Sequence, residues 1–221
     1  MYAFLSGPLA LIAFAVFFAG CLFQAVRFVR LSSKSEHGPP GSWTSRMGLS
    51  IKRAWKNIAD RAKRQGTGLG MNQGMALVTF VFHVCLLCAP IFLLAHNMML
   101  EWSWGFAFPS MPESLSDILT MVVLACGLFF LGRRILVPKV RVLTTARDIG
   151  LFVLVFFPFV TGFIAYHQFF AYKTVLCLHI FFSELLVALI PFTMLNHMLY
   201  FFFNRFLIQD EQSLYPGARR W

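Results

Sequence analysis

The sequence predicts an all-α, polytopic membrane protein with five transmembrane helices. Hydrophobic residues make up 58% of the 221-residue chain, while charged residues make up only 13%. Five apolar stretches are each long enough to cross the roughly 30 Å hydrocarbon core of a bilayer. The basic residues are concentrated in the segments that would face one side of the membrane. Together these three observations favour a membrane bundle over a globular fold.

The five spans are expected at residues 4–29, 75–100, 115–131, 149–171 and 174–203, within a single membrane domain that covers residues 1–221. The first span lacks the features of a signal peptide, so we interpret it as a retained helix. Pro90 and Pro191 lie inside the second and fifth spans. Each should kink its helix, because proline removes a backbone donor and clashes with the preceding turn.

The basic residues predict the orientation of the chain. Ten Lys and Arg lie between Arg27 and Arg64, five lie between Arg133 and Arg147, and three follow the fifth span. Only Lys173 lies on the other side in this topology. Because cytoplasmic loops are enriched in Lys and Arg, the N-terminus should lie outside and the C-terminus in the cytoplasm. The net charge of +10 reflects this asymmetry, and nucleic-acid binding is not needed to explain it.

Residues 32–71 form a basic cytoplasmic loop in which we expect an amphipathic helix. Apolar side chains recur there at helical spacing between basic ones; the apolar set is Met47, Ile51, Ala54, Trp55 and Ile58. A basic amphipathic helix of this kind lies in the surface of a bilayer. Two roles stay open for it, a lipid-surface anchor and a docking ledge for a cytoplasmic partner subunit, and both can hold together.

Five of the six histidines lie within or at the edges of the expected spans, where ionisable side chains are costly and point to a function. They are His83, His96, His167, His179 and His197. His179 and His197 are eighteen residues apart. In a continuous helix this is five full turns, so both rings would project from one face, about 27 Å apart.

The topology pairs four of these histidines across the second and fifth spans. His83 and His197 would lie near the cytoplasmic surface, and His96 and His179 near the outer surface. Each pair can hold one haem iron between two neutral imidazoles, which closes the iron to other ligands and suits electron transfer. Two haems at two depths would carry electrons across the bilayer.

The five cysteines do not form a metal-site or disulfide pattern. All of them lie in apolar segments, where thiols behave as small hydrophobes. Cys85 and Cys88 form a CxxC, but Ala89 follows, so this is not the CxxCH of covalent haem attachment.

In these features the chain resembles the gamma (cytochrome b) subunit of respiratory nitrate reductase and the related cytochrome b subunits of Hmc-, Tmc- and Dsr-type transmembrane redox complexes. The residues that carry the resemblance are Phe82–His83, the run RRILVPKVRVLTTARDI that begins at Arg133, and the pair His179 and His197 at the family's spacing. The similarity covers roughly residues 75–210. The long basic loop and the wide spacing of His83 and His96 favour the Hmc/Tmc/Dsr branch.

The resemblance implies a cytochrome b subunit of an anaerobic respiratory complex in a bacterial inner membrane. It implies two haems b, one ligated by His83 and His197 on the cytoplasmic side and one by His96 and His179 on the outer side. Electrons would pass between menaquinone or a periplasmic multihaem cytochrome c and a cytoplasmic iron–sulfur subunit of the heterodisulfide-reductase type, with other membrane subunits as further partners. The chain would be an electron-transfer subunit rather than a stand-alone enzyme, and no catalytic residue is assigned.

Because the family that the chain resembles exchanges electrons with quinones, we expect a quinone or proton site near the outer haem. The candidates are His167, Glu184, Glu113 and Asp117. His167 has two alternatives, an ordinary interfacial histidine and a haem ligand. For Glu184 the alternative to a proton relay is a protonated acid bonded to a backbone carbonyl.

Arg133, Arg134 and Arg141 lie in the loop after the third span. They contribute to the positive-inside signal, and they are also candidates for bonding to haem propionates, because guanidinium groups match carboxylates well.

Two other functions stay open. One is a haem-poor membrane anchor that docks other subunits. The other is a proton-coupled transporter in which the histidines and Glu184 form a relay, although no internal repeat supports it.

Overall fold

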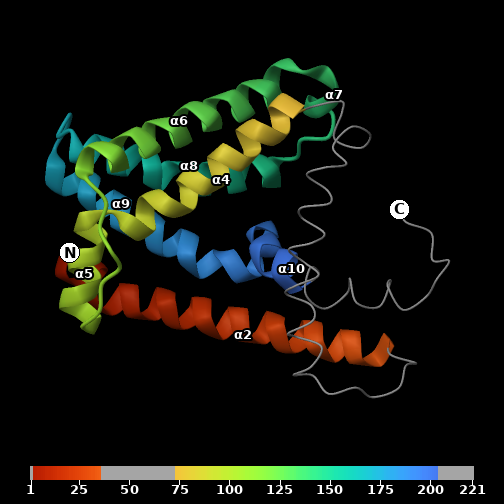
Figure 1. The fold of residues 1–221 in the computed structure, drawn as a ribbon, viewed down its shortest axis with the longest axis horizontal. Coiled ribbons are helices and arrows are strands. Elements are labelled where there is room, and N and C mark those ends of the chain that lie inside the picture. Colours follow the sequence, from red (N-terminus) through yellow and green to blue (C-terminus); the bar gives the residue numbers. More distant parts are fainter. Residues whose placement is uncertain (1, 36–72, 204–221) are drawn as a thin grey trace. The chain divides into compact units, whose positions relative to one another are not determined.

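The structure is a computed structural model that describes residues 2–35 and 73–203 (Figure 1). Within these residues the prediction of an all-α protein is confirmed. The elements are α1 (Tyr2–Phe4), η1 (Leu5–Leu9), α2 (Ala10–Ser35), α4 (Gln73–Phe92), α5 (Leu94–Trp104), α6 (Glu113–Leu136), α7 (Pro138–Arg141), α8 (Ala146–Tyr166), α9 (Tyr172–Leu189), η2 (Ile190–Phe192), η3 (Met194–Asn196) and α10 (His197–Phe203). The amphipathic helix expected around residues 47–58 lies outside the described residues.

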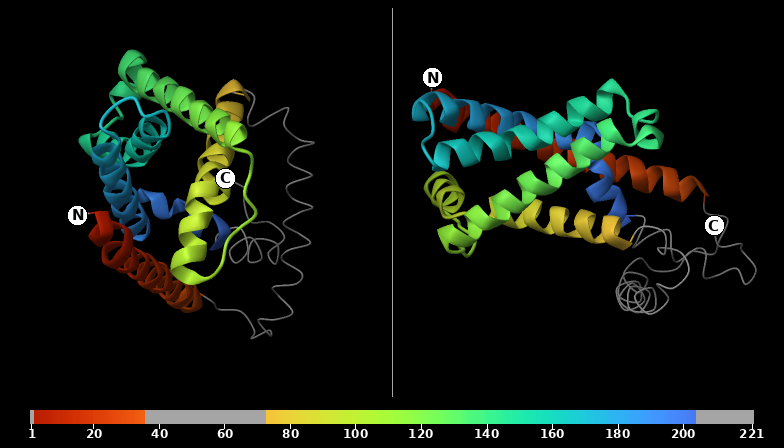
Figure 2. Two further views of the ribbon diagram at one scale, coloured as in Figure 1. Left: turned by 90° about the vertical axis from the view of Figure 1, so that its left-hand side faces the viewer. Right: turned by 90° about the horizontal axis from the view of Figure 1, so that it is seen from above.

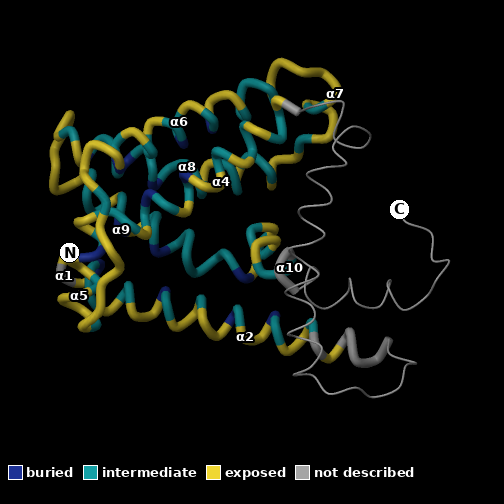
Figure 3. The backbone as a smooth tube through the Cα atoms, in the orientation of Figure 1, coloured by how far each residue is buried: buried dark blue, intermediate teal, exposed yellow. Residues whose placement is uncertain are grey.

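Five helical segments are long and apolar enough to cross a membrane, and each overlaps one of the five expected spans. They are Leu5–Phe28, Gly74–Phe92, Glu113–Leu136, Ala146–Tyr166 and Tyr172–Phe192. Most of their residues are exposed or only partly buried within the chain (Figure 3). Such apolar, outward-facing surface suits contact with lipid. These helices indicate a multi-pass membrane protein.

The second expected span, residues 75–100, is not one helix. Leu93 separates α4 from α5 with an extended backbone (φ −68°, ψ 128°). In the right-hand view of Figure 2, α5 is seen nearly end-on while α4 lies along the page, so α5 leaves the direction of α4. The predicted kink at Pro90 is therefore a complete break, placed three residues later in the chain.

The fifth expected span, residues 174–203, is also interrupted. After α9 come the short 3-10 segments η2 and η3, and Thr193 between them is extended (φ −117°, ψ −176°). The expectation that His179 and His197 share one helical face was wrong, because it assumed a continuous helix between them. The fourth span ends with α8 at Tyr166, before the expected residue 171.

The described chain divides into two compact units, each of which is described by itself. Unit 1 comprises Met1–Ala13 and Asn72–Leu186, and unit 2 comprises Phe14–Met71 and Val187–Trp221. The expectation of a single membrane domain stays a prediction.

Unit 1 is organised around α6, which packs against both α4 and α8. The rings of Phe82 on α4 and Phe130 on α6 meet edge to face with centroids 5.2 Å apart. Val123 of α6 is completely buried. A Cβ at Gly127 would overlap the ring of Phe156 on α8, so glycine at this position lets two spans approach closely.

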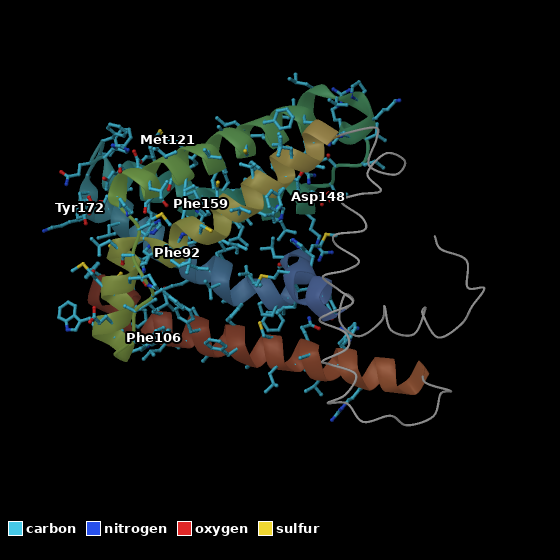
Figure 4. All side chains as sticks on the ribbon, viewed as in Figure 1. Phe92, Phe106, Met121, Asp148, Phe159 and Tyr172 are labelled. Atoms are coloured by element: carbon cyan, nitrogen blue, oxygen red, sulfur yellow. The ribbon has the colours of Figure 1, made fainter. Side chains whose placement is uncertain are left out.

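Helices α8 and α9 are also in contact in unit 1. Figure 4 places Asp148, near the start of α8, and Tyr172, at the start of α9, at opposite ends of the unit. The two helices therefore run in opposite directions. The rings of Phe157 and Phe182 hold them together with centroids 4.3 Å apart.

Unit 2 is held together by a buried glutamine. Gln24 on α2 donates from Nε2 to the carbonyl oxygen of Pro191 (2.7 Å) and accepts from the hydroxyl of Tyr200 (3.0 Å). A Cβ at Gly20 would lie 2.6 Å from Cγ of Pro191, so α2 approaches closely where the fifth span loses its regular hydrogen bonds. Gln24 was not among the predicted residues, although an amide inside an apolar run indicates a buried hydrogen bond.

Candidate functional site

The break at Leu93 determines where His96 lies. A helix that ends leaves its last carbonyl groups without helical donors. His96, in the first turn of α5, turns back so that its Nδ1 lies 2.9 Å from the carbonyl oxygen of Pro90. The imidazole is thus fixed against the end of the preceding helix by a bond that a continuous helix would not offer.

Asn97, the next residue, satisfies the neighbouring groups of the same break. Its Nδ2 donates to the carbonyl oxygens of Ile91 (3.0 Å) and Leu93 (3.2 Å), and its Oδ1 accepts from the backbone N–H of Phe108 (3.0 Å). The side chain is only 2% exposed. Asn97 therefore joins α4, α5 and the following loop, and it is a positioning residue that sequence analysis missed.

His179 of α9 is fixed against α8 in a similar way. Its Nδ1 lies 2.9 Å from the carbonyl oxygen of Pro158 and 3.4 Å from Oγ1 of Thr161. Thr161 in turn donates to the carbonyl oxygen of Phe157 (2.9 Å). A Cβ at Gly162 would lie 3.0 Å from Cε1 of His179, so glycine makes room for the ring.

Unit 1 brings His96 and His179 close together, and their shared role as haem ligands stays a prediction. Their ring centroids are 5.9 Å apart and their planes differ by 20°. Metal–imidazole bonds are about 2 Å long, so two imidazoles on opposite sides of one ion have centroids about 6 Å apart. The separation of the two ring centroids agrees with that value.

The hydrogen bonds also fix which ring nitrogen carries the proton. A carbonyl oxygen only accepts, so Nδ1 of His96 and Nδ1 of His179 must each donate. The lone pair of each neutral ring is then on Nε2, and a histidine that binds a metal commonly holds its other ring N–H in this manner. Burial lowers the pKa of the His96 imidazole, and the hydrogen bond to Pro90 opposes that shift. The net effect favours the neutral, ligand-competent ring.

His83 and His197 share this ring orientation but not these surroundings. Nδ1 of His83 lies 2.7 Å from the carbonyl oxygen of Thr79, and Nδ1 of His197 lies 2.9 Å from that of Met194. Both side chains are exposed. His83 belongs to unit 1 and His197 to unit 2. Their pairing stays a prediction.

His167 differs from the other four histidines. It caps the end of α8, and its Nε2 lies 3.1 Å from Oδ1 of Asp117 on α6. Aromatic rings surround it: the centroids of Phe163, Tyr166 and Phe169 are 4.4, 5.0 and 5.3 Å away. Two of the four residues predicted for a quinone or proton site are thus in contact.

The other two members of that predicted set lie elsewhere. Glu113 is exposed in the first turn of α6, one turn before Asp117. Glu184 is buried in α9 with 8% of its surface exposed. Neither of its carboxylate oxygens has a hydrogen-bond partner among the described residues. The alternative of a protonated acid bonded to a backbone carbonyl is therefore not seen in the described part of the chain.

The arginines predicted for haem propionates lie at one end of unit 1. Arg133 and Arg134 are half-buried in the last turn of α6, and Arg141 is exposed at the end of α7. The contact with propionates stays a prediction.

The described residues contain no group of three or more His, Cys, Asp or Glu that could hold a metal ion. All five cysteines are described, and none forms a disulfide. A pair of imidazoles suits a metal whose other ligands come from a macrocycle, because haem supplies the remaining in-plane nitrogens itself. His96 and His179 fit such a group by donor type, tautomer and ring separation.

Comparison with known proteins gives the chain a relative. Over 220 residues it is 32% identical to a protein of Nitratidesulfovibrio vulgaris (strain Hildenborough), an alignment that covers 99% of this chain and 96% of the relative. The chain therefore belongs to the same family as that protein, which is named simply "Protein". No protein-family model matches the chain, and no solved structure matches it.

Proposed function

We propose that this chain is a dihaem cytochrome b, the membrane subunit of an anaerobic respiratory redox complex. Its five spans would lie in a bacterial inner membrane with the N-terminus outside, the orientation favoured by its basic loops. It would carry electrons between menaquinone or a periplasmic multihaem cytochrome c and a cytoplasmic iron–sulfur subunit of the heterodisulfide-reductase type. Other membrane subunits would complete the complex.

The observation that carries this proposal is the pair of His96 and His179. Their rings are 5.9 Å apart and nearly parallel, and both Nδ1 atoms are bonded to backbone carbonyl groups. A haem bound between two histidines exchanges single electrons. The chain's own contribution is to hold two neutral imidazoles at the required separation and to surround them with apolar helices.

The second haem would take His83 and His197 as its ligands. The support is that both rings have Nδ1 bonded to a nearby carbonyl oxygen, which leaves the lone pair on Nε2. Arg133, Arg134 and Arg141 would bond to the propionates of this cytoplasmic-side haem.

A quinone or proton site would use His167 and Asp117. Their contact at 3.1 Å joins a proton donor to an acceptor, and the rings of Phe163 and Phe169 offer apolar surface to a planar head group. Glu113, one turn from Asp117, would face the aqueous end of this site.

One observation favours the alternative of a haem-poor anchor. Both His83 and His197 are exposed, whereas a haem ligand is commonly enclosed. A transporter is the other alternative, and its support is Glu184, a buried acid inside a span.

The test is a haem count. The intact chain, purified with its complex, is assayed by a reduced-minus-oxidised visible spectrum and by the pyridine haemochrome method. Two haems b per chain are expected. A single haem would favour a partly loaded subunit that uses only His96 and His179. A complex with no haem b would contradict the proposal and favour the anchor or the transporter.

A further inference from the structure

Glu184 is a buried acid that the proposed electron path does not use as a ligand. It lies in α9, inside the span Tyr172–Phe192, and it is 8% exposed. Both of its carboxylate oxygens are without a hydrogen-bond partner among the described residues. An unpaired charge in such surroundings costs several kcal/mol, so the isolated group favours its protonated, neutral form. A nearby positive charge would reverse that preference.

Such a charge would lie close by if the outer histidines hold an iron. Glu184 follows His179 by five residues in the same helix, which separates them by a rise of about 7.5 Å along the axis and about 140° around it. Ser183 lies beside it and donates to the carbonyl oxygen of His179 (2.6 Å). In a low-dielectric site, one charge acts strongly on another over this range.

Few other titratable groups on α9, or on the helices that contact it, could bind a proton in place of Glu184. On α9 itself they are His179, Cys177 and, at the aqueous start, Lys173 and Tyr172. Contacts link α9 to α5 and α8. From α5 the titratable groups are His96 and Glu101; from α8 they are Arg147 and Asp148 at its beginning and Tyr166 at its end.

We propose that Glu184 is a proton-binding site coupled to electron transfer at the His96–His179 pair. The inference rests on the proposed haem function. When a quinol or iron–sulfur donor gives one electron to a ferric iron held by the pair, one proton from the aqueous phase forms an O–H bond at the Glu184 carboxylate. The net charge of the buried site is then unchanged. Oxidation reverses both transfers, because the ferric centre again stabilises the carboxylate.

The test is a reduced-minus-oxidised infrared difference spectrum of the haem-loaded complex. Wild type should gain the C=O stretch of a protonated carboxyl group on reduction, and Glu184→Gln should lack this band. Glu184→Asp keeps the acid and should shift the band, which covers the case in which Glu184→Gln fails to assemble. Glu101→Gln, which changes an exposed acid on α5, should retain the wild-type band.

A potentiometric titration gives an independent readout. In wild type the midpoint potential of the outer haem should fall as pH rises, by up to about 59 mV for each tenfold fall in proton concentration. In Glu184→Gln the potential should be nearly independent of pH over the same range.

The outcomes separate the two proposals. A loaded complex whose carboxyl band and pH dependence are the same in wild type and Glu184→Gln would overturn this inference alone. A complex without haem would overturn the proposed function and, with it, this inference.

Discussion

The two predicted histidine pairs differ in how the chain holds their rings. His83 and His197 bond to carbonyl groups three or four residues earlier in the chain. His96 instead bonds across a helix break, and His179 bonds to a carbonyl on another helix. All four rings have the same tautomer, and within unit 1 the rings of His96 and His179 lie 5.9 Å apart. A hydrogen bond to a nearby carbonyl group fixes the tautomer of a histidine ring. A helix break at His96 and a bond to another helix at His179 also place these two rings close to each other.

The largest effect on stability and on the outer haem is expected from loss of the Asn97 side chain, which joins α4, α5 and the following loop. Asn97→Leu removes three partly buried hydrogen bonds and leaves the carbonyl groups of Ile91 and Leu93 without this donor. Stability should fall by roughly 2–4 kcal/mol, and the outer haem spectrum should broaden as His96 loses its fixed place. Thermal unfolding in detergent and the low-temperature visible spectrum measure the two effects.

Asn196→Leu is the matched control for this prediction, because it changes a half-buried asparagine in the other interrupted span. It should leave the outer haem spectrum unchanged. Equal spectral changes in both variants would show that Asn97 has no special role.

A smaller effect is expected from filling the space beside His179. In Gly162→Ala the new Cβ would lie 3.0 Å from Cε1 and 3.2 Å from Nδ1 of the ring. Relief of this contact should cost about 1–2 kcal/mol and shift the spectrum of the outer haem only.

Gly150→Ala, in the same helix, has nothing within 4 Å of the added Cβ and serves as the control. It should be neutral or slightly stabilising, because alanine favours a helix over glycine. A spectrum of Gly162→Ala identical to that of Gly150→Ala would argue against a ligand role for His179.

His167 belongs to neither histidine pair, so a change at its contact with Asp117 should affect quinol binding and not haem content. His167→Ala should raise the KM for a quinol about tenfold, the equivalent of one lost hydrogen bond of about 1.4 kcal/mol, without loss of haem. Steady-state quinol oxidation measures KM. Haem loss in this variant would instead make His167 a ligand, and an unchanged KM would remove it from the quinone site.

The smallest expected effect is a dependence of folding stability on pH that arises from protonation of His96. Burial lowers its pKa in the folded chain, so below about pH 6.5 the unfolded state binds a proton that the folded state resists. Stability should therefore fall as pH falls through that value. His96→Gln should reduce this dependence in melting curves recorded without haem. An equally steep dependence in the variant would assign it to other groups.

The sequence was sufficient for the number and approximate places of the spans, because length and apolar composition determine which helices can cross a bilayer. It also predicted that His96 and His179 lie near one another, which the structure shows, whereas their role as ligands stays a prediction. It did not predict where the helices are interrupted. Proline marked both interrupted spans, but the extended residues are Leu93 and Thr193, whose positions depend on which side chains donate to the freed backbone carbonyl groups. Asn97 was missed for the same reason.

The most direct test of a haem held by His96 and His179 compares the haem content of three variants. His96→Ala and His179→Ala should each lose one haem b per chain relative to wild type, with assembly of the complex retained. His167→Ala should keep the full wild-type haem content, because the His167 ring in wild type uses its Nε2 for the contact with Asp117. Full haem content in both His96→Ala and His179→Ala would contradict the claim that this pair holds a haem.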